Sequence, residues 1–349
     1  MKRHATHRPR YSFDAMIGVG GIGSGMFFML NGDQTLGREE SRSGRILDKN
    51  DYCKLHIISH YVKALLGSRF QVLPVGKVGN DDVGKKLLTE MEEAGLCLDH
   101  VAVDKTRHTL FSVCFLYPDR SGGNMTTDDS ACSTVDGEFV AKAEREFERF
   151  AGKGIALAAP EVPLSARAAL LDLATRHRFF RVASLTSQEL GDMRGFPILE
   201  KVDLLCINLD EARSALRGSV ASDDPRAVVE QSVQLFATAN PKILVSITHG
   251  KQGSFVWDGS AITHMAAPAV EVVSTAGAGD AFTSGLIAGI VGGLSLKEAQ
   301  QLATLAGAYS VTSPDTIHKG LNRRQLLNLA RQSGMSPAEK LLPLLEEEQ

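Results

Sequence analysis

The chain has 349 residues, 43% of them hydrophobic and 23% charged, which is enough to bury one large α/β core. Its formal net charge of −3 argues against the basic surface that nucleic-acid-binding and membrane-binding proteins use, so we expect neither partner. Its apolar runs stay below the roughly 18 residues that a membrane-spanning helix requires. The five cysteines lack the spacing of a disulfide framework or a zinc site, and we expect reduced thiols in a cytoplasmic protein.

Residues 1–12 are basic but contain no apolar segment, so we predict a loosely held lead-in and not a secretory signal. After them, apolar runs alternate with helical patterns. The apolar runs predict strands at residues 70–75, 155–159, 182–185, 202–208 and 243–248. The helical patterns predict helices at residues 82–94, 165–177, 209–216 and 225–237. This alternation favours an α/β fold with a mostly parallel central sheet covered on both faces, over residues 13–335. An acidic tail is expected at 336–349.

Three stretches interrupt this pattern. Residues 110–117 are rich in β-forming side chains and end in a polar turn at 118–123. Residues 254–265 predict a hairpin, and residues 26–50 are mostly polar and charged. Together they indicate one α/β domain with an inserted lid, and not two independent domains.

The first glycine-rich stretch, GVGGIGSG at residues 18–25, has the GxGxxG spacing of a dinucleotide-binding turn. Such a site also needs a helix that opens at the third glycine and an acidic residue at the end of the next strand. Here Gly25 and the turn at Gly32 and Asp33 leave little room for a helix, so we expect no nicotinamide or flavin site. The glycines either permit a tight strand exit or let a substrate approach the backbone closely.

The second glycine-rich stretch, STAGAGDAFTSG at residues 274–285, predicts a turn between a strand end at 270–273 and a helix from Ala281. The amides of this turn can point at an anion, helped by the helix dipole. Asp280 follows directly. A carboxylate repels phosphate, but it can take the proton from a hydroxyl that attacks a phosphoryl group. The alternative is that Asp280 is only an acidic residue in the first turn of a helix.

STAGAGDAF resembles the C-terminal motif of the ribokinase-like (PfkB) carbohydrate kinase family, usually of the form DTTGAGDxF. Three further segments resemble motifs of that family in the family's order: GKVGNDDVG at residues 76–84, NLDE at 208–211 and ITHGKQG at 247–253. Each match is weak alone, and the four together carry the resemblance. It implies a ribokinase-like three-layer α/β/α fold with a small β lid, and ATP-dependent transfer of the γ-phosphoryl group to a hydroxyl of a sugar, sugar phosphate or nucleoside.

The resemblance also implies how this transfer is catalysed. Asp280 would be the catalytic base. Three backbone amides would form the anion hole for the transferring group: those of Gly277, Ala278 and Gly279. Asn208 and Glu211 would organise Mg²⁺ through water, which suits an ion that prefers oxygen ligands and keeps its waters. The same Asn and Glu can also be read as a helix cap.

The resemblance implies ligand-binding residues as well. Four residues would line ATP: Thr248, Gly250, Gly253 and Ser313. Six residues near the first strand would contact the small-molecule acceptor: Gly20, Ser24, Asn31, Asp33, Lys54 and His56. Parts of residues 20–50 and 108–127 would form the lid, through which a homodimer is possible.

The chain departs from the family pattern where the acceptor binds. The family usually has an Asp shortly after the first strand, and its GGxxxN motif corresponds here to DYCKLH at residues 51–56. Ordinary ribose or fructose recognition is therefore doubtful. The basic side chains of this region either meet an anionic acceptor or form a solvated lid edge: Arg38, Arg42, Arg45, Lys54 and His56. Ser274 replaces the first Asp of the DTTGAGD motif, which makes K⁺ activation less expected. A non-catalytic ligand-binding or regulatory protein on the same fold is the alternative.

Overall fold

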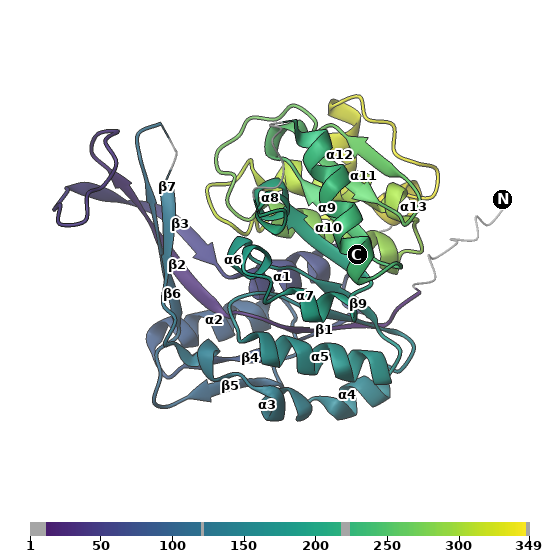
Figure 1. Ribbon diagram of the computed structural model, residues 1–349, viewed down its shortest axis with the longest axis horizontal. Helices are drawn as coiled ribbons and strands as arrows, with labels where there is room; N and C mark the ends of the chain where they lie inside the picture. The colour runs from purple at the N-terminus through teal and green to yellow at the C-terminus, as the bar shows by residue number, and fades with distance from the viewer. Residues whose placement is uncertain (1–11, 120–121, 218–223, 347–349) are drawn as a thin grey trace, which may run out of the picture.

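The computed structural model describes residues 12–119, 122–217 and 224–346 (Figure 1). Residues 1–11 of the predicted basic lead-in and residues 347–349 of the predicted acidic tail lie outside this part of the chain. Two residues of the predicted polar turn, 120 and 121, lie outside it too.

The larger of two sheets has nine strands within the described residues. They are β1 (Ala15–Val19), β4 (Gln71–Gly79), β5 (Val101–Asp104), β8 (Gly154–Ala158), β9 (Phe180–Ala183), β10 (Leu204–Asn208), β11 (Leu244–Thr248), β12 (Ser254–Trp257) and β13 (Ile262–Met265). Their order is β13-β12-β11-β10-β9-β8-β1-β4-β5. All neighbours from β11 to β5 are parallel, and the hairpin of β12 and β13 adds an antiparallel edge.

Helices cover both faces of this sheet. One face carries α1 (Lys54–Leu66), α2 (Asp82–Glu93), α10 (Ala278–Val291), α11 (Leu296–Ser310), α12 (Arg323–Gln332) and α13 (Leu342–Glu346). The other carries α3 (Gly137–Ala141), α4 (Glu144–Arg149), α5 (Leu164–Arg176), α6 (Ser187–Gly191), α7 (Phe196–Leu199), α8 (Leu209–Ala215) and α9 (Pro225–Ala239). Because side chains alternate along a strand, β1 sends Met16 into the first core and Ile17 into the second.

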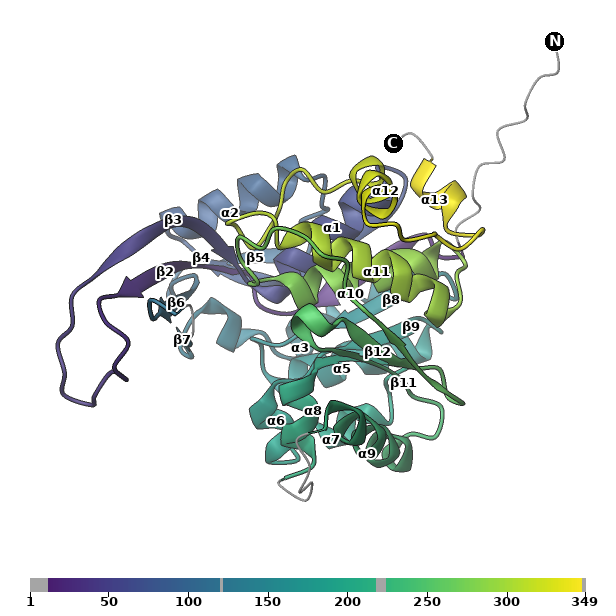
Figure 2. The ribbon, with the colours of Figure 1, turned by 90° about the horizontal axis from the view of Figure 1, so that it is seen from above.

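The smaller sheet forms the lid, which lies at one end of the molecule (Figure 1). Its strands are β2 (Gly23–Leu30), β3 (Gly44–Tyr52), β6 (Leu110–Leu116) and β7 (Gly122–Thr126), in the order β3-β2-β6-β7. The loop between β2 and β3 projects away from the α/β body (Figure 2). At the base of the lid, the Asn50 amide donates to Asp315 Oδ1 at 2.7 Å and the Tyr52 amide to Thr316 Oγ1 at 3.0 Å. These bonds tie β3 to the segment that follows α11.

The structure confirms the predicted α/β class, the mostly parallel sheet, the lid and the hairpin at residues 254–265. It also confirms that no helix follows the first glycine-rich stretch, because β1 leads directly into lid strand β2. The strand end predicted at residues 270–273 is wrong, since that stretch forms no regular structure, and α10 begins at Ala278 and not at Ala281. The sequence also missed β3 and β7, whose lid positions are too polar or too rich in glycine to give a strand pattern.

The C-terminal segment contributes to the fold, because Leu344 and Leu345 of α13 are buried in the core that covers the α10 face. Within the described residues, no helix combines the length and the apolar character needed to cross a membrane.

Candidate active site

The candidate site lies where the strand order of the large sheet reverses. β1 pairs with β4 on one side and with β8 on the other, and in open parallel sheets ligands bind beyond the carboxyl ends of the strands near such a reversal. Three polar residues stand at those ends: Glu161 after β8, Asn208 at the end of β10 and Thr248 at the end of β11. The parallel arrangement therefore brings residues distant in sequence to one edge of the sheet.

The N-terminus of α10 faces this edge. Gly277 is its N-cap, with a φ of 77° that side-chain-bearing residues rarely adopt. A Cβ atom there would lie 2.6 Å from the carbonyl oxygen of Thr316, so both the backbone angle and the space require glycine. Gly279 is different, since the nearest heavy atom to its added Cβ would be Thr248 Oγ1 at 4.0 Å. A site that leaves one glycine free of protein neighbours has room for a ligand there.

Asp280 lies in the first turn of α10 and is 8% exposed. Its Oδ1 atom is 3.4 Å from the ammonium of Lys54, which begins α1. Burial raises the pKa of Asp280, and the Lys54 charge opposes that rise. In return, the Asp280 carboxylate raises the pKa of Lys54 above its usual value. The ion pair thus joins the N-termini of two helices and places a positive charge beside the buried carboxyl group of Asp280.

Glu161 is a member of the site that the sequence analysis missed. Its Oε2 atom accepts a hydrogen bond from the Lys54 backbone N–H at 3.3 Å. Burial raises its pKa to about 7, with the charge of Lys54 opposing and the charge of Asp280 adding to the rise. Its φ of 75° is unusual for a residue with a side chain, and Gly21 leaves the space for it, because a Cβ there would lie 2.4 Å from Glu161 Oε2. The signal in the sequence was an acidic residue just beyond a fully apolar strand.

This raised pKa predicts how stability depends on pH. Between pH 4.5 and 7 the folded protein keeps a proton on Glu161 that the unfolded chain has already released. The stabilisation that this proton gives the folded state is therefore fully present below pH 4.5 and is lost as the pH rises toward 7. Glu161→Gln should raise the free energy of unfolding by about 3 kcal/mol at pH 8 and change it little at pH 4.5, as measured by denaturant unfolding. An equal effect at both pH values would contradict this.

Asn208 and Glu211 cap α8 reciprocally. The Asn208 side chain accepts from the Glu211 amide at 2.8 Å, and the Glu211 side chain accepts from the Asn208 amide at 2.7 Å. Burial raises the pKa of Glu211, and the Lys54 charge lowers it. The cap does not use all the lone pairs of these side-chain oxygens. The pair can therefore cap the helix and still hold the water shell of a divalent cation.

One small cavity brings most of these groups together. It has a volume of about 40 Å³, and its lining comes from β10, β11, the residue after β9 and the N-terminal turns of α1, α8 and α10: Lys54, Ser184, Cys206, Ile207, Asn208, Glu211, Ser246, Thr248, Gly279, Asp280, Phe282 and Thr283. Within the described chain, Lys54 is the one cation in that lining. The cavity can hold a few waters or the end of a larger ligand. In the described residues no group of three or more His, Cys, Asp or Glu side chains could hold a metal ion directly.

The other residues predicted to line ATP lie apart from this cavity. Gly250 and Gly253 have φ values of 51° and 98° and make the turn between β11 and β12. A Cβ at Gly253 would lie 1.9 Å from the Met265 carbonyl oxygen, so this glycine is required by the turn itself. Ser313 is buried after α11, and its Oγ accepts from the Asp315 amide at 3.1 Å.

The residues predicted to contact the acceptor fall into two groups. Gly20 and Ser24 lie at the junction of β1 with the lid, where the Ser24 hydroxyl donates to the Asp51 carbonyl at 3.1 Å. Asn31 and Asp33 are exposed in the β2–β3 loop, and the Asn31 side chain donates to Ser43 Oγ at 3.0 Å within that loop. Ser24 therefore contacts Asp51, whereas Gly20 lies against Leu55 and Ala159. Asn31 and Asp33 belong to the loop that projects away from the body (Figure 2).

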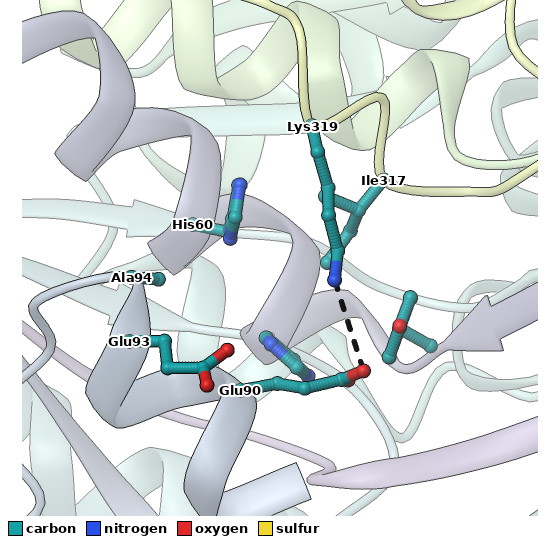
Figure 3. A pocket seen from close by; sticks show the side chains of 8 residues that line it. His60, Glu90, Glu93, Ala94, Ile317 and Lys319 are labelled. Atoms are coloured by element: carbon teal, nitrogen blue, oxygen red, sulfur yellow. Dashed lines mark ion pairs between the residues drawn. The ribbon is translucent and has the colours of Figure 1, made fainter.

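His56 lies in a different cavity, behind α1. This cavity has a volume of about 150 Å³, and its lining comes from α1, α2, the end of β3 and the segment after α11: Tyr52, His56, His60, Glu90, Glu93, Ala94, Ile317 and Lys319. In Figure 3, Lys319 reaches across it toward Glu90, with Nζ 3.8 Å from Oε1. Burial lowers the pKa of His56 to about 3, so the imidazole is neutral. The structure thus brings Lys54 to Asp280 but places His56 elsewhere.

Comparisons with known proteins agree with this architecture. Residues 60–322 match the model of the family described as pfkB family carbohydrate kinase. The chain is 25% identical over 304 residues to 2-dehydro-3-deoxygluconokinase of Bacillus subtilis, a match that covers 80% of this chain and 90% of that protein. It is 32% identical over 114 residues to ATP-dependent 6-phosphofructokinase of Thermoanaerobacterium thermosaccharolyticum, but this match covers only 33% of either chain.

A solved structure is similar over nearly the whole fold. Ribokinase from Cryptococcus neoformans var. grubii, determined in complex with ADP, superimposes with a TM-score of 0.74. The superposition covers 91% of this chain and 99% of that one at 19% sequence identity, so it establishes the ribokinase-like fold alone.

Proposed function

The chain belongs to the pfkB family of carbohydrate kinases, and we propose that it transfers the γ-phosphoryl group of ATP to a hydroxyl of a sugar or sugar-like small molecule. The observation that carries the proposal is the buried Asp280 directly after the glycine turn of α10, in one cavity with Asn208, Glu211 and Thr248. In phosphoryl transfer the protein mainly positions the reactants and stabilises charge. The site supplies groups for both tasks.

Asp280 is the general base of this proposal. Its carboxylate accepts the proton of the acceptor hydroxyl while the hydroxyl oxygen forms its bond to the γ-phosphorus. The bond between the γ-phosphorus and the bridging oxygen breaks, and ADP leaves with that oxygen. Lys54 keeps Asp280 ionised before the transfer, because its ammonium lies 3.4 Å from the carboxylate.

The backbone amides of Gly277, Ala278 and Gly279 receive the transferring group in this proposal. They stand at the positive end of α10, where negative charge is stabilised. The Ala278 amide has a long bond of 3.3 Å to the Thr275 carbonyl, and a phosphoryl oxygen would compete with it. The free space at Gly279 lets the phosphoryl group approach these amides.

Asn208 and Glu211 would hold Mg²⁺ through its water shell, and the ion, when bound, neutralises charge on the ATP phosphates. The raised pKa of Glu211 supports this assignment, since a buried carboxyl without enough nearby positive charge gains from a cation. Thr248 reaches the same cavity, and Gly250 and Gly253 shape the turn after it, so we assign these three to the nucleotide. Ser313 stays a weaker prediction for the adenine side.

The Lys54–Asp280 ion pair predicts a change in the pH profile. Replacing Lys54 by Met removes the charge that lowers the pKa of Asp280, so that pKa should rise further. The acidic limb of the kcat–pH profile should then move to higher pH, while Lys54→Arg, which keeps the charge, should leave the limb near its original position. Identical limbs in the Met and wild-type proteins would show that Lys54 does not set the ionisation of the base.

The experiment that tests the function is ADP release from Mg²⁺-ATP across a panel of sugars, sugar phosphates, nucleosides and polyols. Acceptor-dependent release is expected for at least one class. ATP binding without release from any acceptor would favour the alternative, a non-catalytic ligand-binding or regulatory protein on this fold.

A homodimer through the lid and a cytoplasmic location stay predictions. Ile46 on β3 and Met125 on β7 are large apolar side chains that are 65% and 57% exposed, which is consistent with a second copy covering the lid. Sedimentation measurements on the wild-type protein and on Ile46→Glu would test the dimer.

A further inference from the structure

Asp51 is a buried carboxylate at the end of lid strand β3, 9% exposed, and the proposed mechanism does not use it. Its Oδ2 atom accepts from the Ser112 hydroxyl at 3.0 Å and from the Cys114 thiol at 3.6 Å, both on lid strand β6. A Cβ at Gly25 would lie 2.5 Å from the same oxygen, so a bare glycine on β2 makes room for this carboxylate. Three lid strands therefore converge on one acid.

This acid belongs electrostatically to the active site. Burial raises the pKa of Asp51, and the charge of Asp280 adds to that rise. The charges of Asp51 and Glu161 both act on Cys53, which is the residue between Tyr52 and Lys54. The carboxyl groups of Asp51, Glu161 and Asp280 are therefore electrostatic neighbours around the N-terminus of α1. A carboxylate offers about four lone-pair positions, so Asp51 can accept from a ligand hydroxyl as well as from Ser112.

Most of the positive charges near the lid face other partners or solvent. Lys49, two residues before Asp51 on β3, has its ammonium 5.3 Å from the centre of the Phe27 ring. Lys54 is already paired with Asp280. Arg42 donates to Glu40 and to the Gln34 carbonyl within the β2–β3 loop. Arg38 and Arg45 are exposed on the lid. The Lys54–Asp280 pair carries no net charge, and Glu161, with a pKa of about 7, is only partly ionised near neutral pH. An anionic acceptor would therefore meet the negative charge of Asp51 and that of the ATP phosphates.

We propose that Asp51 is a specificity-determining residue that accepts a hydrogen bond from an acceptor hydroxyl, and that the acceptor is an uncharged, hydroxyl-rich molecule. Sugar acids and sugar phosphates are rejected by repulsion from the Asp51 carboxylate and the ATP phosphates. The inference rests on the proposed kinase function. It also implies that the basic lid residues form a solvated lid edge and do not bind an anionic acceptor.

The first test compares matched acceptors on the wild-type protein. Each neutral sugar is paired with its aldonate or uronate and with its phosphate, and kcat/KM is measured by ADP release. We expect the neutral member to exceed its anionic partners by at least about 10-fold, because like charges at close range are strongly disfavoured. A preference for the anionic member would overturn the inference and leave the kinase function standing.

The second test is Asp51→Asn, which keeps the shape of the side chain and removes its charge. KM for the preferred neutral acceptor should rise about 10-fold with kcat nearly unchanged, because a hydrogen bond to a charged acceptor is stronger than one to an amide. The neutral-to-anionic ratio of kcat/KM should fall by a similar factor. If Asp51 had only a structural role, Asp51→Asn would lower kcat/KM for the neutral and the anionic acceptors by the same factor. An unchanged neutral-to-anionic ratio would therefore overturn the assignment of Asp51. Asp99→Asn, at an exposed position before β5, is the matched control and should change neither value.

Binding measurements separate failure of the inference from failure of the function. Thermal shifts with the same matched acceptors in the presence of Mg²⁺-ADP need no turnover, and the wild-type protein suffices if Asp51→Asn does not fold. Stabilisation by neutral members without any ADP release would refute the kinase function and keep the inference. Stabilisation by anionic members alone would refute the inference.

Discussion

Replacing Asp280 by Asn should lower kcat by at least about 10²-fold and leave the fold and ATP binding intact. Asn keeps the size of the side chain but cannot accept the proton of an attacking hydroxyl. The pKa of Asp280 is already raised by burial, so the neutral amide is tolerated at this position and the melting temperature should not fall. The measurement is steady-state ADP release with the best acceptor of the panel, together with ATP affinity by calorimetry.

Asp99→Asn controls for the loss of one surface carboxylate, since Asp99 is exposed and lies in the turn before β5. A kcat within a few fold of the wild-type value in Asp280→Asn would remove Asp280 from the base role. It would also leave the ion pair with Lys54 as a purely structural contact. Loss of ATP affinity without loss of kcat would instead point to a role in nucleotide binding.

The sequence predicted the fold well, and it selected residues that the structure brings into one cavity, because both depend on local patterns. Buried strands such as β8 read as short apolar runs, and their order with helices predicts a parallel sheet. The glycine turn and Asp280 are adjacent in sequence, so their spacing alone predicted an anion-binding turn followed by a candidate general base. Asn208 and Glu211 could be placed for the same reason, since a cap and its third helical residue are close by construction.

The acceptor side could not be predicted in the same way, because it is assembled from distant segments. Glu161 reaches the site only because β8 lies next to β1, and Asp51 meets Ser112 of β6 only because β2, with a glycine at position 25, lies between β3 and β6. The mixed lid is half exposed, so β3 and β7 lack the apolar alternation that identifies strands. Lys54 and His56 are two residues apart and point to different cavities, because neighbours at that spacing do not share a helix face.

The two glycines of the α10 turn should respond to the same substitution in different ways. In Gly277→Ala the new methyl group meets the Thr316 carbonyl oxygen at 2.6 Å and the backbone keeps a φ of 77°. We expect a loss of about 2 kcal/mol or more in the free energy of unfolding. The turn would also move, so kcat should fall by about 10²-fold or more through misplaced amides.

Gly279→Ala should give the opposite result for stability. Apart from its chain neighbours and the backbone of its own helix, its new methyl group meets no described atom closer than 4.0 Å. Ala is also favoured over Gly in a helix, so the melting temperature should stay the same or rise slightly. Activity should nevertheless fall by about 10²-fold, because the methyl group occupies the space through which a phosphoryl group approaches the amides. Thermal unfolding and ADP release on the two variants separate these effects. A fully active Gly279→Ala protein would show that the phosphoryl group does not pass beside Gly279. The result can be interpreted directly because this variant is expected to keep its stability.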